Sequence, residues 1–197
     1  VIDVSVQERS TGEISFGAGF SNSSGVLGDV SIRERNLLGR GQDLLLSAKI
    51  GEKKQEIDLS FTEPYFLDKN VSAGVDVFRK SIDLQSESSF DRETLGFALR
   101  SGYRITELLS QSWEYTLRQD KITDIPANAS LAVKEQAGDF ITSSIGQTIL
   151  YDRRNNRFNP KKGYFLKMKN IVAGFGGDSQ YVRNDWSGST YHQIAEK

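Results

Sequence analysis

The chain has 197 residues, of which 37% are hydrophobic and 26% are charged, and its formal net charge at pH 7 is −1. No apolar run approaches the roughly 18 to 20 residues that a transmembrane helix requires, which excludes helical membrane insertion. The near-zero net charge gives no overall field to attract nucleic acid. Because the chain has no cysteine, neither disulfides nor thiolate metal sites are expected.

The first eight residues alternate apolar and polar side chains, as in the closing strand of a domain that lies upstream. Residues 1–10 are therefore predicted to be that strand and a junction, and residues 11–197 to be a second domain. No amino-terminal signal peptide is visible, so we expect a trimmed mature chain or a fragment.

Residues 12–21 show the pattern that repeats through the rest of the chain. The apolar side chains fall on one face of an extended strand, and the small or polar ones fall on the other. The apolar face comprises Ile14, Phe16, Ala18 and Phe20, and the opposite face comprises Ser15, Gly17, Gly19 and Ser21. One face can contact lipid while the other borders a wet interior.

Nine further stretches alternate in the same way and match the length of a tilted membrane-crossing strand. The mean hydropathy of the whole chain, −0.45, is also compatible with such a barrel, because the polar residues that face the lumen lower the average. The predicted fold is all-β, an antiparallel transmembrane β-barrel. The further strands are expected at about residues 26–35, 44–50, 56–62, 71–80, 92–105, 110–122, 141–152, 164–173 and 181–195.

The links between these stretches alternate in character. Residues 81–91 and 123–140, after the fifth and seventh predicted strands, are long and polar, which is typical of loops on the outer side. Several intervening links are compact, so the even-numbered links and the upstream domain are predicted to face the periplasm. Residues 62–70 and 153–163 are longer than a minimal hairpin requires.

Three blocks resemble the barrel domain of the BamA family, the central subunits of the bacterial barrel assembly machinery. They are Arg33–Gln42 (RERNLLGRGQ), Phe61–Phe66 (FTEPYF) and Tyr151–Gly163 (YDRRNNRFNPKKG). In that family a last periplasmic POTRA domain leads through an E-R-x-T-G junction into the first barrel strand. Here Glu8–Gly12 (ERSTG) occupies that junction.

The resemblance implies a bacterial outer-membrane protein that folds and inserts other barrel proteins. The family barrel has sixteen strands and an R-G-F motif in a long outer loop, so this chain, with about ten strands and no such motif, is expected to be the amino-terminal part. The implied partners are unfolded outer-membrane proteins, assembly-machinery lipoproteins and outer-membrane lipid. We expect no nucleic-acid partner, no cofactor, no metal and no enzymatic activity, because the glycine clusters form no nucleotide-binding loop.

The first barrel strand is the candidate functional site. Gly17 and Gly19 weaken a β-ladder by their backbone entropy and their lack of side-chain packing. If its pairing with the barrel's last strand is marginal, the strand becomes a template for β-augmentation by a substrate strand. The alternative is that the glycines allow close packing against lumen groups. The candidate template is Glu13, Ile14, Ser15, Phe16, Gly17, Ala18, Gly19 and Phe20.

A basic turn with interleaved aromatic residues is a second candidate site. Its cations are Arg153, Arg154, Arg157, Lys161 and Lys162. Such a segment can serve as an RNA platform, but the neighbouring asparagines, proline and glycine favour a periplasmic turn. We expect this turn to contact lipid headgroups or partner proteins.

The sequence gives no support for catalysis at a histidine and leaves two other functions open. His192 is the sole histidine and has no nucleophile signature near it, so a strand residue without catalytic duty is expected. One alternative is a two-partner-secretion pore or passive channel of the same superfamily, which planar-bilayer conductance would reveal. Another is a soluble β-sandwich binding module, whose apolar faces would pack together.

Overall fold

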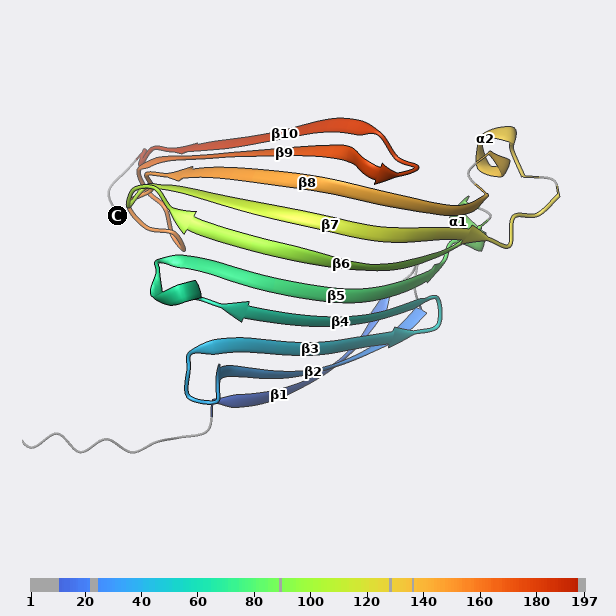
Figure 1. Cartoon of the computed structure of the whole chain (residues 1–197), viewed down its shortest axis with the longest axis horizontal. Helices are drawn as coiled ribbons and strands as arrows, with labels where there is room; N and C mark the ends of the chain where they lie inside the picture. The colour runs from blue at the N-terminus through green and yellow to red at the C-terminus, as the bar shows by residue number, and fades with distance from the viewer. Residues whose placement is uncertain (1–10, 22–24, 89, 128, 136, 195–197) are drawn as a thin grey trace, which may run out of the picture.

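The computed structural model describes residues 11–21, 25–88, 90–127, 129–135 and 137–194. They form one antiparallel sheet of ten strands in sequence order (Figure 1), which confirms the predicted all-β fold. The predicted upstream strand at residues 1–10 lies outside the described residues. The strands are β1 (Gly12–Ser21), β2 (Gly25–Leu37), β3 (Gln42–Gly51), β4 (Lys54–Glu63), β5 (Val71–Asp83), β6 (Asp91–Arg104), β7 (Leu109–Thr123), β8 (Gly138–Asp152), β9 (Gly163–Gly177) and β10 (Tyr181–Tyr191).

Short helical segments lie in three of the links. They are η1 (Phe66–Asp68), α1 (Gln85–Ser88) and α2 (Leu131–Lys134). No helix in the described part of the chain is long and apolar enough to cross a membrane.

The largest differences from the predicted strand bounds, at the ends of β9 and β10, have non-local reasons. β10 ends at Tyr191 and not near residue 195, because Tyr191 pairs with Gly163, where its partner strand β9 begins. β9 runs on to Gly177 after a register shift opposite Thr142 and Ser144. Gly174, Gly176 and Gly177 have φ of 131°, 99° and 93°, a region that favours glycine and lets β9 bulge and then pair again.

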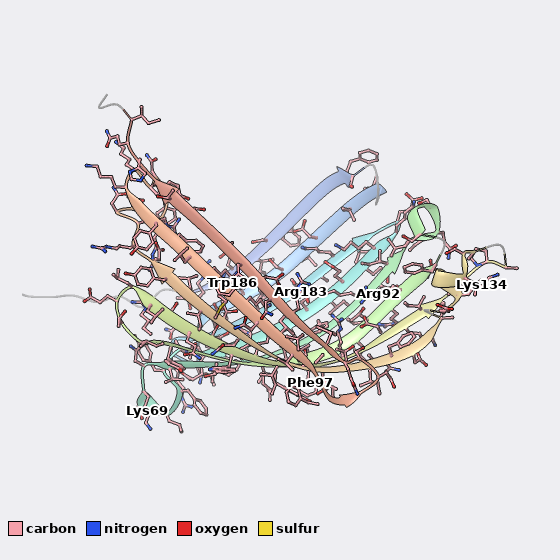
Figure 2. All side chains as sticks on the ribbon, turned by 90° about the horizontal axis from the view of Figure 1, so that it is seen from above. Lys69, Arg92, Phe97, Lys134, Arg183 and Trp186 are labelled. Carbon is pink, nitrogen blue, oxygen red and sulfur yellow. The ribbon has the colours of Figure 1, made fainter. Side chains whose placement is uncertain are left out.

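The sheet curves into an open trough (Figure 2), with Arg92 on its inner side and Phe97 on its outer side. Among the described residues, the buried hydrophobic side chains are those of Ala98 and Ala173, so there is no dry apolar core. The large apolar residues instead form an exposed outer face, as in the row of Leu46, Leu59 and Val77. The sandwich alternative is therefore wrong, because one sheet cannot cover its own apolar face.

The inner face carries charged side chains that are joined across strands. Glu56 is buried and accepts Lys54 at 3.2 Å, with Lys49 and Lys80 within 4.0 Å. Asp120 is buried between Arg92 at 2.8 Å and Arg118 at 3.0 Å. These ion pairs, together with the one between Asp76 on β5 and Arg100 on β6, join each strand from β3 to β7 to the next one.

The links separate onto two ends of the sheet (Figure 1). The links after β2, β4, β6 and β8 lie at the end where β1 begins, and those after β3, β5, β7 and β9 lie at the opposite end. We call the first the periplasmic end, in keeping with the orientation predicted from the sequence, and the other the outer end.

The separation of the two faces makes adjacent positions respond differently to charge. Leu46→Lys places an ammonium group in hydrocarbon and is expected to lower the free energy of unfolding by about 2–4 kcal/mol. Ser47→Lys places the same group on the inner face, where Ser47 pairs with Asp58, and should cost far less. Urea unfolding in lipid vesicles measures both changes, and equal losses would contradict the assignment of faces.

Candidate functional site

Strand β1 forms one end of the sheet. It pairs with β2 in an unbroken register from Gly12↔Glu34 to Ser21↔Gly25. Its other edge has no partner strand within the described part of the chain. The side chain of Phe16 is accordingly 79% exposed, against 44% for Leu46, which has a neighbouring strand on both sides. The eight predicted template residues thus lie together on one strand with a free backbone edge.

The two glycines of β1 face the inner side but differ in their surroundings. A Cβ atom added at Gly17 would collide with the carboxylate of Asp29 on β2, which lies over it. A Cβ added at Gly19 would meet nothing within 4 Å. Close packing therefore accounts for Gly17, whereas Gly19 leaves the ladder without a packing side chain.

Side chains tie β1 to β2 at its periplasmic end. The Thr11 hydroxyl donates to Glu34, and Arg35 forms an ion pair with Glu13 at 3.0 Å. Further along the strand, Gly17 and Gly19 supply no side chain to the inner face. The ion pairs that join β3 to β7 thus have no counterpart at these two positions of β1.

The basic turn between β8 and β9 is held by Asp152, which the sequence analysis did not single out. Arg154 donates to the buried Asp152 carboxylate through Nε at 2.9 Å, and its guanidinium carbon lies 4.9 Å from the ring centroid of Phe165. This hydrogen bond raises the pKa of Arg154. Arg157 reaches the same carboxylate at 3.4 Å. Arg154 therefore acts as a structural clamp and is not available to a ligand.

Two asparagines fix the rest of this turn. The Asn155 side-chain oxygen accepts the backbone N–H groups of Lys161 and Lys162, each at 2.9 Å. The Asn156 oxygen accepts those of Phe158 at 2.8 Å and Asn159 at 2.9 Å. Asparagines in a loop are the signal that sequence reasoning offers for such turns. The outcome is an ordered turn that displays Arg153, Lys161 and Lys162 at the surface.

Comparison with known proteins identifies the family. The family model of the Omp85 superfamily domain matches residues 36–197. The outer membrane protein assembly factors BamA of Neorickettsia risticii and Nitratidesulfovibrio vulgaris are 26% and 30% identical over 100% and 98% of this chain. A sorting and assembly machinery component 50 homolog of Xenopus tropicalis is 27% identical over 98% of it.

A solved structure shows the same fold. The crystal structure of BamA from Haemophilus ducreyi lacking POTRA domains 1–3 matches 93% of this chain with a TM-score of 0.79 at 23% identity. This chain covers 38% of that chain, and it covers 27%, 24% and 40% of the three relatives above. It therefore spans about a quarter to two fifths of the proteins that it resembles.

The difference between the two glycines can be measured. Gly19→Ala is expected to strengthen the β1–β2 ladder by about 0.5–1 kcal/mol, because alanine lowers the backbone entropy of the unfolded chain and fits the open space. Gly17→Ala is the matched control, since its methyl group must displace Asp29. Hydrogen exchange of the β1 amides measures the effect of each substitution on the ladder. Equal stabilisation by the two substitutions would contradict the difference between Gly17 and Gly19.

The clamp in the basic turn gives a second test. Asp152→Asn removes the charge that Arg154 and Arg157 share, and the turn should lose about 1.5–3 kcal/mol of local stability. Hydrogen exchange of residues 153–162 measures this loss. Asp178→Asn, which weakens the hydrogen bond from the Ile141 N–H at the outer end, should leave the basic turn unchanged. A turn that stays equally protected in Asp152→Asn would show that the clamp is dispensable.

Proposed function

The chain belongs to the Omp85 superfamily and lies in the bacterial outer membrane, and on this premise we propose that it is part of a factor that folds and inserts other β-barrel proteins. The relatives named as outer membrane protein assembly factors support this proposal. The structural observation that supports it most is that β1 lies at one end of the sheet, where its outer edge has no partner strand among the described residues.

An unpaired strand edge is important in the membrane because of the surrounding hydrocarbon. Water is absent from the bilayer core, so a strand entering it must satisfy its backbone N–H and C=O groups by pairing with another strand. The edge of β1 from Glu13 to Phe20 offers such a partner. Because the bonds run between backbones, one template suits substrate strands of many sequences. Pairing and burial in lipid supply the free energy, so the step needs no nucleotide.

The weak attachment of β1 allows the barrel to open at this strand. A strand that exchanges its partner must first release the barrel's last strand, and Gly19 lowers the stability of the ladder at its outer half. The hydrogen bond from Thr11 to Glu34 and the ion pair between Glu13 and Arg35 keep β1 attached to β2 during this exchange. The resemblance to the sixteen-strand family implies that further strands follow β10, so the edge of β10 is covered.

The remaining partners follow from the same proposal. Unfolded outer-membrane proteins are the substrates, and the lipoproteins of the assembly machinery dock on the periplasmic parts of the whole protein. Outer-membrane lipid surrounds the apolar outer face.

Disulfide crosslinking tests the template. The chain has no cysteine of its own, so single cysteines at Ser15 or Gly19 need no background substitution. They should trap a cysteine in the terminal strand of a substrate during its assembly. Ser47→Cys, in a strand paired on both sides, is the control and should trap none.

Two results would overturn the proposal. One is crosslinking of β1 to strands of the same protein alone while the substrate folds normally. The other is a large, stable conductance in planar bilayers, which would favour the transport alternative. Several inner-face cations that would line such a conduit are paired with acids, as Arg33 is with Asp43 and Lys169 with Glu114.

A further inference from the structure

The two ends of the sheet carry opposite charge. The links at the periplasmic end, residues 38–41, 64–70, 105–108 and 153–162, contain seven arginines and lysines and two acidic residues. The described residues of the links at the outer end, 52–53, 84–88, 90, 124–127, 129–135, 137 and 178–180, contain two lysines and five acidic residues. The periplasmic end is therefore suited to anionic groups.

The same end displays apolar side chains whose exposure the turns impose. Phe158 is 99% exposed, at a position fixed by the hydrogen bond from its N–H to Asn156. Leu38 and Leu67 are exposed as well, in the links after β2 and β4. Both leucines have φ of 55°, a left-handed conformation that is costly for a residue with a Cβ atom. Exposed apolar residues held at such cost point to a surface that covers them.

Cations accompany these apolar residues in three of the four links, whereas the link at residues 105–108 has Glu107 and no cation. Arg40 follows Leu38, Lys69 follows Leu67, and Arg157, Lys161 and Lys162 flank Phe158. The turn after β8 also adjoins the aromatic part of the lipid face, where the rings of Tyr151 and Tyr164 stack with centroids 5.5 Å apart. Aromatic residues at this level of a barrel are typical of the boundary between hydrocarbon and headgroups.

We propose that these turns form a lipid-binding rim in which Arg40, Lys69, Arg157, Lys161 and Lys162 contact phospholipid phosphates of the periplasmic leaflet. Leu38, Leu67 and Phe158 insert at the boundary of the headgroup layer and the acyl chains. A protein partner would cover one contiguous patch, whereas a leaflet surrounds the barrel and meets every turn. The charge and the repeated pairing of cation with apolar residue fit the leaflet.

This inference rests on the membrane orientation in the proposed function and is independent of the template at β1. The rim fixes the height of the barrel in the bilayer, because lysines and arginines there cannot enter hydrocarbon and the apolar residues resist leaving it. The barrel wall beside the basic turn is thereby held at one depth while β1 exchanges partners.

A single fluorescent label at a time tests the rim in the reconstituted full-length protein. Phe158→Cys carrying nitrobenzoxadiazole should show blue-shifted emission and quenching by brominated lipid in vesicles that contain phosphatidylglycerol. Leu131→Cys is the matched control, because Leu131 is 76% exposed and lies in α2 at the outer end (Figure 1). Its label should remain unquenched.

Charge neutralisation completes the test. Replacing Lys161 and Lys162 by glutamine should reduce the quenching at position 158 towards the Leu131 level, while the circular dichroism of the sheet stays unchanged. Quenching at position 158 no greater than at position 131 in lipid alone would overturn the inference and favour a protein partner. Loss of substrate crosslinking to β1 with quenching retained would count against the template and leave the rim standing.

Discussion

The constraint on which this structure depends is that hydrocarbon leaves no backbone polar group unpaired without a large cost. Each of the strands β2 to β9 meets it with a neighbour on both sides, in registers that run nearly unbroken across the sheet. β1 meets it on one side within the described residues. β10 likewise has one neighbour within the described residues. An unpaired strand edge is the costliest place in such a sheet, and it is also where another strand gains most by pairing.

Side chains on the inner face hold some strands of the sheet together more firmly than others. Ion pairs around Glu56, Asp76 and Asp120 join each strand from β3 to β7 to the next one. β1 is fastened near its start, and at Gly19 it has no side chain to contribute. A firm wall beside a weakly fastened strand is the arrangement that a partner exchange requires, because the opening stays confined to one seam.

Much of this fold was predictable from sequence, because the alternation of apolar and polar residues is visible within each strand by itself. What escaped prediction depends on residues far apart in the chain. The end of β10 is set by Gly163, and the extension of β9 by a bulge opposite Thr142. In the candidate sites, the roles of the two β1 glycines separate only once Asp29 is placed over Gly17. Arg154, grouped with the other cations by sequence, turns out to be held by Asp152.

We infer that β1 is the most weakly held of the first strands. Hydrogen–deuterium exchange of the full-length protein in lipid vesicles measures this directly, strand by strand. We expect amides from Glu13 to Phe20 to exchange faster than those of β5, and fastest near Gly19. Equal protection of β1 and β5 would contradict it, because a strand held as firmly as its neighbours offers no seam for a substrate to enter.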